Sequence, residues 1–453
     1  MGVEVKQQHA ISKAQLDKFA SDYQNSPQHR ALANAIQKNG VNAVAINQAS
    51  LINMQYTFSH EIKTGEITNQ KQSGRCWMFA GLNTLRVPVA KQCNLDSFEL
   101  SQNYQMFWDK FEKANYYLES ILETLDEATD SRLVAWLLSG PVQDGGQWDM
   151  FVNLVAKYGV VPKYVMPETF HSSRTGVMNH LITLKLREYA VKLRNLSSNQ
   201  HASVNELRLE KAQMLSEIYT MLCHFLGQPP SQFDFEYRDK DNEFHRDANL
   251  TPQQFYEKYV GVNLDDYVSI INAPTQDKPF DRTYTVRYLG NVKDGKQVLY
   301  LNVEIDQLRD LALQQLKDDE PVWFGCDVGK MLDRDAGIMD TALYDYEAVL
   351  GVPFNMSKAE RLDYGESLMT HAMVFTGVNV VDGKPNRWKV ENSWGTDPGN
   401  KGFFIMSDPW FDEFMYQIVV QKKYLPAHLQ SALEQEPIEL QPWDPMGSLA
   451  MMR

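Results

Sequence analysis

The chain has 453 residues, 43% of them hydrophobic, and a formal net charge of −14. This length is sufficient for a large core and more than one subdomain, while the acidic balance disfavours general nucleic-acid binding, because an acidic surface repels phosphate. The four cysteines are too few and too scattered for a disulfide framework, and no run approaches the ~18 apolar residues of a membrane span. The polar amino-terminal stretch lacks the apolar core of a signal peptide, so we expect a cytoplasmic protein that does not enter a membrane.

Residues 1–65 are expected to form a helical amino-terminal arm. Apolar residues at helical spacing occupy 12–20 and 28–36, and Gly40 is placed to end the second helix. The pattern over 55–67 is typical of an extended segment. This arm leads directly to the stretch that carries the strongest chemical signal.

That stretch places a cysteine, Cys76, at the start of an apolar segment with helical spacing, which Pro88 is expected to end. Gly74 permits a tight turn just before the helix. A thiol at a helix amino terminus lies at the positive end of the helix dipole, which favours the nucleophilic thiolate. Gln70 supplies an amide N–H that can point to the same place. A cysteine beside a tryptophan is otherwise an ordinary small buried residue, so this interpretation depends on partners elsewhere in the chain.

A turn that can line a binding cleft follows within residues 66–171, which are expected to form a helical subdomain. A helical pattern begins at Ser101 and continues to about residue 138, and the pair Gly145-Gly146 then leads into a further helix. Only glycine lets another backbone approach closely, so the pair is suited to contact an extended peptide. The alternative is an ordinary turn.

The chain then changes from helical to strand patterns. Residues 172–262 have strong helical periodicity and many charges, and they are expected to form a helical insertion. Residues 263–430 are expected to form a β subdomain, because Asp294-Gly295 lies between two strand-like runs at 283–289 and 297–303. Further strands are expected at 322–328, 371–381, 387–392 and 401–406.

Two of these late strands carry the partners that Cys76 needs. His371 enters one apolar run, and Asn392 ends another, followed by Ser393-Trp394-Gly. Cysteine, histidine and asparagine in this order resemble the papain-like cysteine peptidases. The interval from Cys76 to His371 exceeds the ~130–150 residues usual in that family by roughly 150 residues, and the insertion at 172–262 accounts for most of the excess.

The resemblance implies an α+β fold with two subdomains, one helical and one built from a β-sheet or barrel. It also implies a thiolate–imidazolium pair of Cys76 and His371, with Asn392 fixing the ring and Trp394 shielding that hydrogen bond. Gln70 and the backbone N–H of Cys76 would form the oxyanion hole. Gly145 and Gly146 would bind the substrate backbone.

The carboxy-terminal segment 431–453 narrows the resemblance. Its sequence Trp443-Asp-Pro-Met-Gly, together with the long insertion, is similar to the bleomycin hydrolase and bacterial aminopeptidase C family. That family implies a homohexamer with active sites facing an inner chamber, and an arm that lies in the cleft and restricts cleavage to amino-terminal residues. Members usually end at the position of Ala450, whereas this chain continues with Met451-Met452-Arg453, which leaves open how Ala450 contributes to substrate binding.

We therefore predict a cysteine aminopeptidase that acts on peptides through a thioester intermediate, without a cofactor or a metal. One alternative is an endopeptidase of the same fold with a displaced arm. The other is a chamber-forming binding protein, including one that binds nucleic acid, which the acidic balance makes unlikely.

Overall fold

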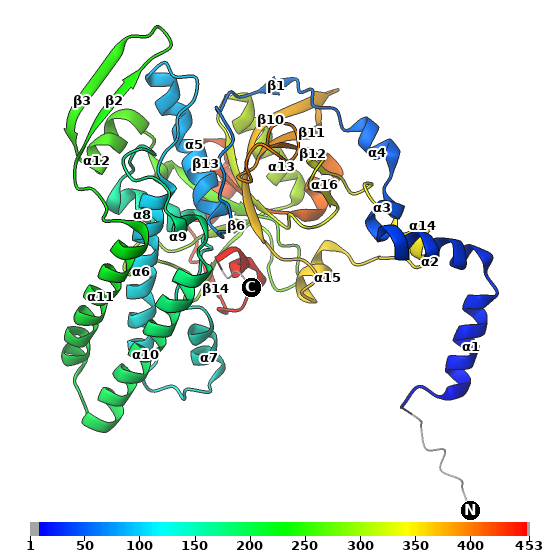
Figure 1. The fold of residues 1–453 in the computed structure, drawn as a ribbon, viewed down its shortest axis with the longest axis horizontal. Coiled ribbons are helices and arrows are strands. Elements are labelled where there is room, and N and C mark those ends of the chain that lie inside the picture. Colours follow the sequence, from blue (N-terminus) through cyan, green and yellow to red (C-terminus); the bar gives the residue numbers. More distant parts are fainter. Residues whose placement is uncertain (1–8, 451–453) are drawn as a thin grey trace, which may run out of the picture. The chain divides into compact units, whose positions relative to one another are not determined.

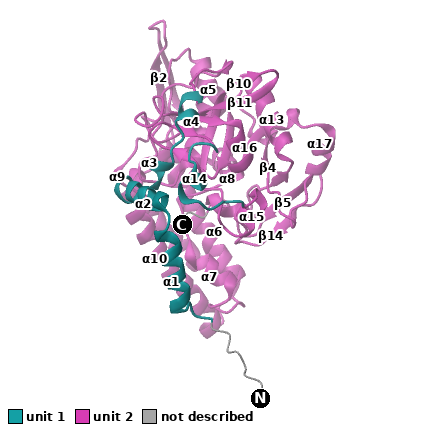
Figure 2. Cartoon of the chain, turned by 90° about the vertical axis from the view of Figure 1, so that its right-hand side faces the viewer, with its two compact units in different colours: residues 1–53, 341–355 teal, residues 54–340, 356–453 magenta. Residues whose placement is uncertain are grey.

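The computed structural model describes residues 9–450, which divide into two compact units. The first unit comprises residues up to 53 together with 341–355, and the second comprises 54–340 together with residues from 356 onwards (Figure 2). The five segments predicted above remain a division made on the sequence. Within residues 9–450, none of the helices combines the length and the apolar character needed to cross a lipid bilayer.

The first unit consists of short helices with clear sequence signals at their ends. Its helices are α1 (Lys13–Gln24), α2 (Pro27–Asn39), α3 (Val41–Ala45), α4 (Gln48–Asn53) and α14 (Tyr346–Leu350). Ser12 caps α1 through a reciprocal pair of hydrogen bonds with Gln15, and Ser26 caps α2. Gly40 ends α2 with a φ of 83°, which favours glycine. The two helices and the cap predicted for this stretch are confirmed.

The second unit begins with its helical part (Figure 1). It contains α5 (Cys76–Gln92), α6 (Gln102–Glu123), α7 (Arg132–Ser139), α8 (Trp148–Tyr158), α9 (Phe170–Ser173), α10 (Gly176–Gln200) and α11 (Val204–Leu226). The chain then forms a two-stranded hairpin, β2 (Phe233–Arg238) and β3 (Phe244–Leu250), followed by the short α12 (Pro252–Phe255). Helical periodicity over 172–262 did not indicate this hairpin.

A mixed sheet forms the other part of the second unit. The strands run in the order β14-β5-β6-β4-β13-β7-β10-β11-β12-β9-β8, and β1 pairs with β10. Their bounds are β1 (His60–Glu61), β4 (Tyr267–Ile271), β5 (Arg282–Val286), β6 (Tyr300–Asn302), β7 (Val322–Cys326), β8 (Leu332–Asp333), β9 (Ile338–Met339), β10 (His371–Val381), β11 (Lys384–Glu391), β12 (Phe403–Ser407), β13 (Met415–Gln421) and β14 (Ile438–Leu440). The remaining helices of this part are α13 (Ile305–Lys317), α15 (Lys358–Asp363), α16 (Asp408–Phe414) and α17 (Ala427–Leu433).

Both faces of this sheet are covered, which explains the uninterrupted apolar runs in the sequence. Along β10, Ala372 and Val374 belong to the core shared with α5, whereas Met373 and Phe375 belong to a second core with α13 and α16. β7 is buried along its whole length. The predicted α+β class is therefore confirmed.

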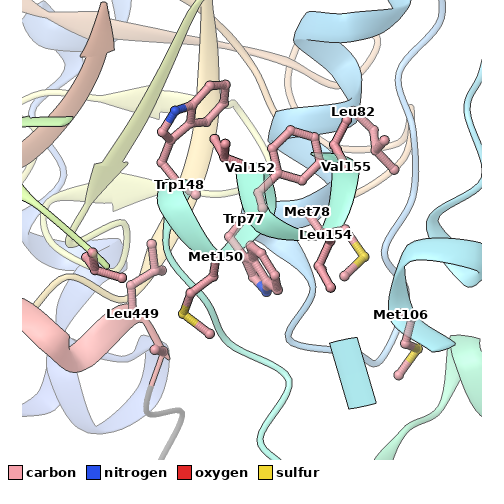
Figure 3. Close-up of a cluster of buried hydrophobic side chains, with 14 of the residues drawn as sticks. Trp77, Met78, Leu82, Met106, Trp148, Met150, Val152, Leu154, Val155 and Leu449 are labelled. Carbon is pink, nitrogen blue, oxygen red and sulfur yellow. The ribbon is translucent and has the colours of Figure 1, made fainter. Parts of the chain in front are cut away.

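The core around α5 fixes the position of the cysteine-bearing helix. Figure 3 shows Trp77, Met78 and Leu82 of α5 packed against side chains of α8, with Leu449 from the carboxy-terminal segment alongside. The prediction that Pro88 ends this helix is wrong, because α5 continues through it to Gln92. Proline inside a helix removes one backbone hydrogen bond at a cost of about 3 kcal/mol. The burial of apolar residues on both sides of Pro88 offsets this cost.

Candidate active site

Cys76 is the first residue of α5 and is 3% exposed. The backbone N–H groups of Ala372, Trp77 and Cys76 itself point to the sulfur and favour its ionised form. Because Ala372 directly follows His371, this contact places the thiol beside the start of β10. The helix terminus and the histidine strand therefore meet at one point, as the resemblance implies.

The orientation of the histidine ring follows from its partner. His371 Nε2 lies 2.9 Å from Asn392 Oδ1, and the same oxygen accepts a 2.7 Å hydrogen bond from the backbone N–H of Ser393. A backbone N–H can only donate, so this second contact requires the oxygen, and not the amide nitrogen, to face the ring. His371 Nε2 must then carry a proton, which leaves Nδ1 as the nitrogen available to exchange a proton with the thiol.

Burial keeps each of the two reacting groups neutral when it is considered alone. It raises the pKa of the Cys76 thiol to about 11 and lowers the pKa of His371 to about 4. The backbone N–H groups at the amino terminus of α5 lower the pKa of the thiol, as predicted. The loss of hydration on burial raises this pKa by more. A proton transfer from Cys76 to His371 would create both charges together, and opposite charges stabilise each other.

Gln70 is held beside this pair by hydrogen bonds from both ends of its amide. Its Nε2 donates to the Ser73 carbonyl at 2.7 Å, and its Oε1 accepts from Ser393 Oγ at 2.6 Å. These bonds fix the amide and leave one N–H of Nε2 for a ligand. Ser393 thus connects the Asn392 loop to Gln70, a link that the sequence did not reveal.

Trp394 packs on the ring of His371. Its indole centroid lies 4.9 Å from that of the His371 ring. The guanidinium of Arg334 lies over the same indole at 4.6 Å, and its positive charge contributes to lowering the pKa of His371. Arg334 was not singled out in the sequence because nothing near it in the chain belongs to the site.

The two glycines face different neighbours. A Cβ at Gly145 would overlap the Leu449 carbonyl and Ala450, whereas a Cβ at Gly146 would overlap the Trp77 indole. The carboxy-terminal segment, which ends in a 3-10 helix over Pro445–Ala450, therefore lies against Gly145. Ala450 itself is 7% exposed. Met451, Met452 and Arg453 lie outside the described residues.

The buried carboxylate of Asp144 holds the turn before these glycines in place, and no pattern in the sequence indicated this role. Both oxygens of the Asp144 carboxylate are occupied: its partners are the Gly74 N–H at 2.9 Å, Lys110 Nζ at 2.6 Å, Thr175 Oγ1 at 2.5 Å and Asn179 Nδ2 at 2.8 Å. These contacts hold the pKa of Asp144 well below its usual range, although burial acts in the opposite direction. Its backbone carbonyl accepts the Trp77 indole N–H at 2.7 Å. Asp144 thus connects the glycine turn to the loop that precedes Cys76.

Comparison with known proteins gives this arrangement its context. The model of the Peptidase C1-like family matches residues 10–447. Aminopeptidase C of Listeria monocytogenes is 52% identical over 98% of this chain and 100% of its own length, and bleomycin hydrolase of Mus musculus is 45% identical over 90% and 91%. The crystal structure of PepW from Lactobacillus rhamnosis is 56% identical, with a TM-score of 0.95 over 97% of this chain and 99% of that one. The chain therefore belongs to the Peptidase C1-like family, and it is a cysteine aminopeptidase of the branch that contains aminopeptidase C and bleomycin hydrolase.

Proposed function

We propose that the chain removes amino-terminal residues from peptides, with Cys76 as the nucleophile and His371 as the general acid and base. The observation that carries this proposal is the contact of the Cys76 thiol with the start of β10, where Asn392 holds His371 in a single tautomer. The remaining roles follow from this pair.

In the first half of the reaction, His371 Nδ1 takes the proton of Cys76, and the sulfur attacks the carbonyl carbon of the peptide bond. The oxygen that becomes negative is stabilised by the backbone N–H of Cys76 and by the free N–H of Gln70 Nε2. When the C–N bond breaks, Nδ1 returns its proton to the leaving amine, and a thioester remains on Cys76.

In the second half, His371 Nδ1 removes a proton from a water molecule that attacks the thioester carbonyl. The C–S bond breaks, His371 Nδ1 returns its proton to the sulfur, and the released carboxylic acid loses its remaining proton to solvent. Asn392 accepts the Nε2–H throughout, and Trp394 shields that bond from water. No other reactant is consumed.

Replacement of the nucleophile tests this proposal. We expect Cys76→Ala to abolish hydrolysis of an aminoacyl-aminomethylcoumarin, and iodoacetamide to label the wild-type protein at Cys76 with matching loss of activity. Cys223→Ala is a matched control, because Cys223 is a free cysteine on α11 of the helical part. Hydrolysis that persists in Cys76→Ala would exclude Cys76 as the nucleophile, and a wild type that does not hydrolyse the substrate would favour a binding or scaffold role.

We further propose that the segment 445–450 confines the enzyme to amino-terminal residues by occupying the acyl side of the cleft. Its contact with Gly145 supports this, as do a 2.8 Å hydrogen bond from Ser448 Oγ to the Met369 carbonyl and a 3.0 Å ion pair between Asp444 and Lys278. A side chain at residue 145 has no room beside Leu449.

Gly145→Ala tests the role of this segment against the alternative of an endopeptidase. We expect the variant to displace the segment and to gain cleavage of an N-acetylated peptide that the wild type refuses. Gly329→Ala is a control for the substitution itself, since a Cβ there meets no neighbouring atom and the φ of Gly329 is not positive. Wild-type cleavage of the acetylated peptide would instead support the endopeptidase.

We also propose that the protein is a cytoplasmic homohexamer whose substrates are peptides and not nucleic acid. The absence of disulfides among the cysteines of residues 9–450 and the net charge of −14 support this assignment. The exposed apolar side chains of Leu16, Phe19 and Tyr23 on one face of α1 support the proposed assembly.

A further inference from the structure

The direction in which a peptide leaves the site follows from the roles of the two catalytic side chains. The acyl half of the substrate becomes attached to Cys76, on the side where Gly145 and the carboxy-terminal segment lie. The amine half receives its proton from His371. The leaving peptide must therefore continue beyond His371, toward the ring that packs on it, Trp394.

Arg334 lies next along this path. It belongs to the turn between β8 and β9, it is exposed, and its guanidinium lies 4.6 Å from the Trp394 ring centroid. The His371 and Trp394 ring centroids are 4.9 Å apart. An extended peptide advances ~3.3–3.6 Å per residue, so a carboxylate one to three residues beyond the cleaved bond is within reach of the guanidinium.

The guanidinium of Arg334 is available for such a group. No residue between 9 and 450 forms an ion pair or a side-chain hydrogen bond with it; within that range it stacks on Trp394, and its charge acts on the His371 ring. The neighbouring Asp333 is already engaged, because its Oδ1 accepts the backbone N–H groups of Asp335 and Ala336 at 3.1 and 3.0 Å. Stacking on an indole orients the planar guanidinium while leaving its edge free.

We propose that Arg334, supported by Trp394, forms a carboxylate-binding subsite on the leaving-group side of the cleft. The group it binds is the terminal carboxylate of a short peptide, so that dipeptides and tripeptides with a free carboxy terminus are the preferred substrates. Two parallel N–H···O bonds from one guanidinium match a carboxylate in geometry as well as charge. This inference rests on the proposed roles of Cys76 and His371, and it adds the class of substrate.

The test compares two substrates that differ only in this group, the dipeptide Leu-Ala and its carboxamide Leu-Ala-NH2. For the wild-type protein we expect kcat/KM to be about tenfold higher for the free acid than for the carboxamide. This factor is typical of one exposed charge-assisted contact, which the carboxamide lacks. The ratio of the two values is compared within each variant, so differences in the amount of active protein cancel.

Three substitutions then assign the preference to Arg334. We expect Arg334→Gln to bring the ratio close to one, Arg334→Lys to leave an intermediate ratio, and Arg334→Glu to reverse it in favour of the amide. The preference should also decrease in 0.5 M salt, because an exposed contact between charges is screened. Arg246→Gln is the control, because Arg246 is an exposed arginine on the β2–β3 hairpin, paired with Asp234 and Glu236; it should retain the wild-type ratio.

Two results would overturn the subsite. One is a wild-type ratio near one, and the other is a preference for the free acid that survives in both Arg334→Gln and Arg334→Glu. Failure of the proposed catalytic roles is recognised separately, because neither dipeptide would then be cleaved in a manner that depends on Cys76.

Discussion

At the scale of single residues, hydrogen bonds to Asn392 and Ser393 fix the side chains proposed as the base and as an oxyanion donor, His371 and Gln70. Asn392 Oδ1 orients His371, and Ser393 Oγ orients Gln70 at 2.6 Å. The histidine and the amide are thus aligned by two consecutive residues. A displacement of this loop would disturb proton transfer and charge stabilisation together.

Gln70→Ala should reduce kcat by about 10²–10³-fold, because one of the two oxyanion donors is lost while the nucleophile remains. KM should change little, since the charge on the oxygen develops only in the transition state. Steady-state kinetics on an aminoacyl-aminomethylcoumarin measures both constants. Ser393→Ala removes the hydrogen bond to Gln70 Oε1 but keeps the Gln70 side chain, so we expect a smaller loss of kcat. A rise in KM with unchanged kcat in Gln70→Ala would assign this side chain to substrate binding instead.

The pH dependence of stability should distinguish a neutral Cys76 and His371 from a thiolate–imidazolium pair. The folded protein holds the pKa of His371 at about 4, below its usual 6.5, so this residue stabilises the fold fully above pH 6.5, and the contribution is lost as the pH falls towards 4. The folded pKa of Cys76 is about 11, above its usual 9, so its contribution is complete below pH 9 and is lost as the pH rises towards 11. Each full effect is on the order of 3 kcal/mol.

Urea unfolding of the wild type, His371→Gln and Cys76→Ala across pH 4–10 measures these contributions. His371→Gln should flatten the acid limb of the stability curve, and Cys76→Ala should flatten the alkaline limb. If the acid limbs of wild type and His371→Gln run parallel, the pair is already a thiolate and an imidazolium in the resting protein.

At the scale of elements, the turn that carries the glycines is joined to the loop before α5 through buried charges. Lys113 Nζ donates to the carbonyls of Gln143 and Gly145 at 2.8 and 2.6 Å and pairs with Asp109, while Lys110 pairs with Asp144. Both lysines come from α6 and are buried. The backbone of the glycine turn is therefore held by one helix, and the same turn holds the loop that precedes Cys76.

Asp144→Ala should destabilise the protein by about 3–5 kcal/mol, because it leaves Lys110 buried without its counter-charge. Since the pKa of Asp144 is held well below its usual value, the stabilisation by this carboxylate is present above about pH 4 and is lost only as the pH falls through its lowered pKa. Chemical unfolding of Asp144→Ala, Lys110→Met and the double variant measures the coupling. A double variant no more stable than the sum of the single changes would show that the ion pair carries little energy.

These elements also show what the sequence could predict. The strands that carry His371 and Asn392 were recognisable because burial on both faces produces long apolar runs, and the cysteine helix was recognisable from its periodicity and Gly74. The prediction that Pro88 ends the helix was wrong because the sequence shows only the local cost of a proline inside a helix. The packing that offsets this cost comes from residues distant in the chain. Asp144 was missed for a similar reason, since its partners range from Gly74 to Asn179 in the chain.

At the scale of the whole molecule, the helix α1 carries an exposed apolar face. None of its residues is buried, and Leu16, Phe19 and Tyr23, which share one face, are 55%, 58% and 48% exposed. An isolated helix shorter than ~12–15 residues is marginal in water, so an apolar face at this spacing is typical of a surface that becomes covered in an assembly. This observation supports the proposed homohexamer.

Placing charge on this stripe tests whether it holds the assembly together. We expect the wild type to sediment as a hexamer and the double variant Leu16→Glu, Phe19→Glu to sediment as a smaller species, because two carboxylates would have to lose water to enter the interface. The double variant Val204→Glu, Leu209→Glu is the matched control: it introduces the same two charges at residues of α11 that are 55% and 73% exposed, and it should leave the hexamer intact. A monomeric wild type would refute the hexamer itself. A Leu16→Glu, Phe19→Glu variant that still sediments as a hexamer would show instead that contacts elsewhere hold the subunits together and that the stripe on α1 serves another purpose.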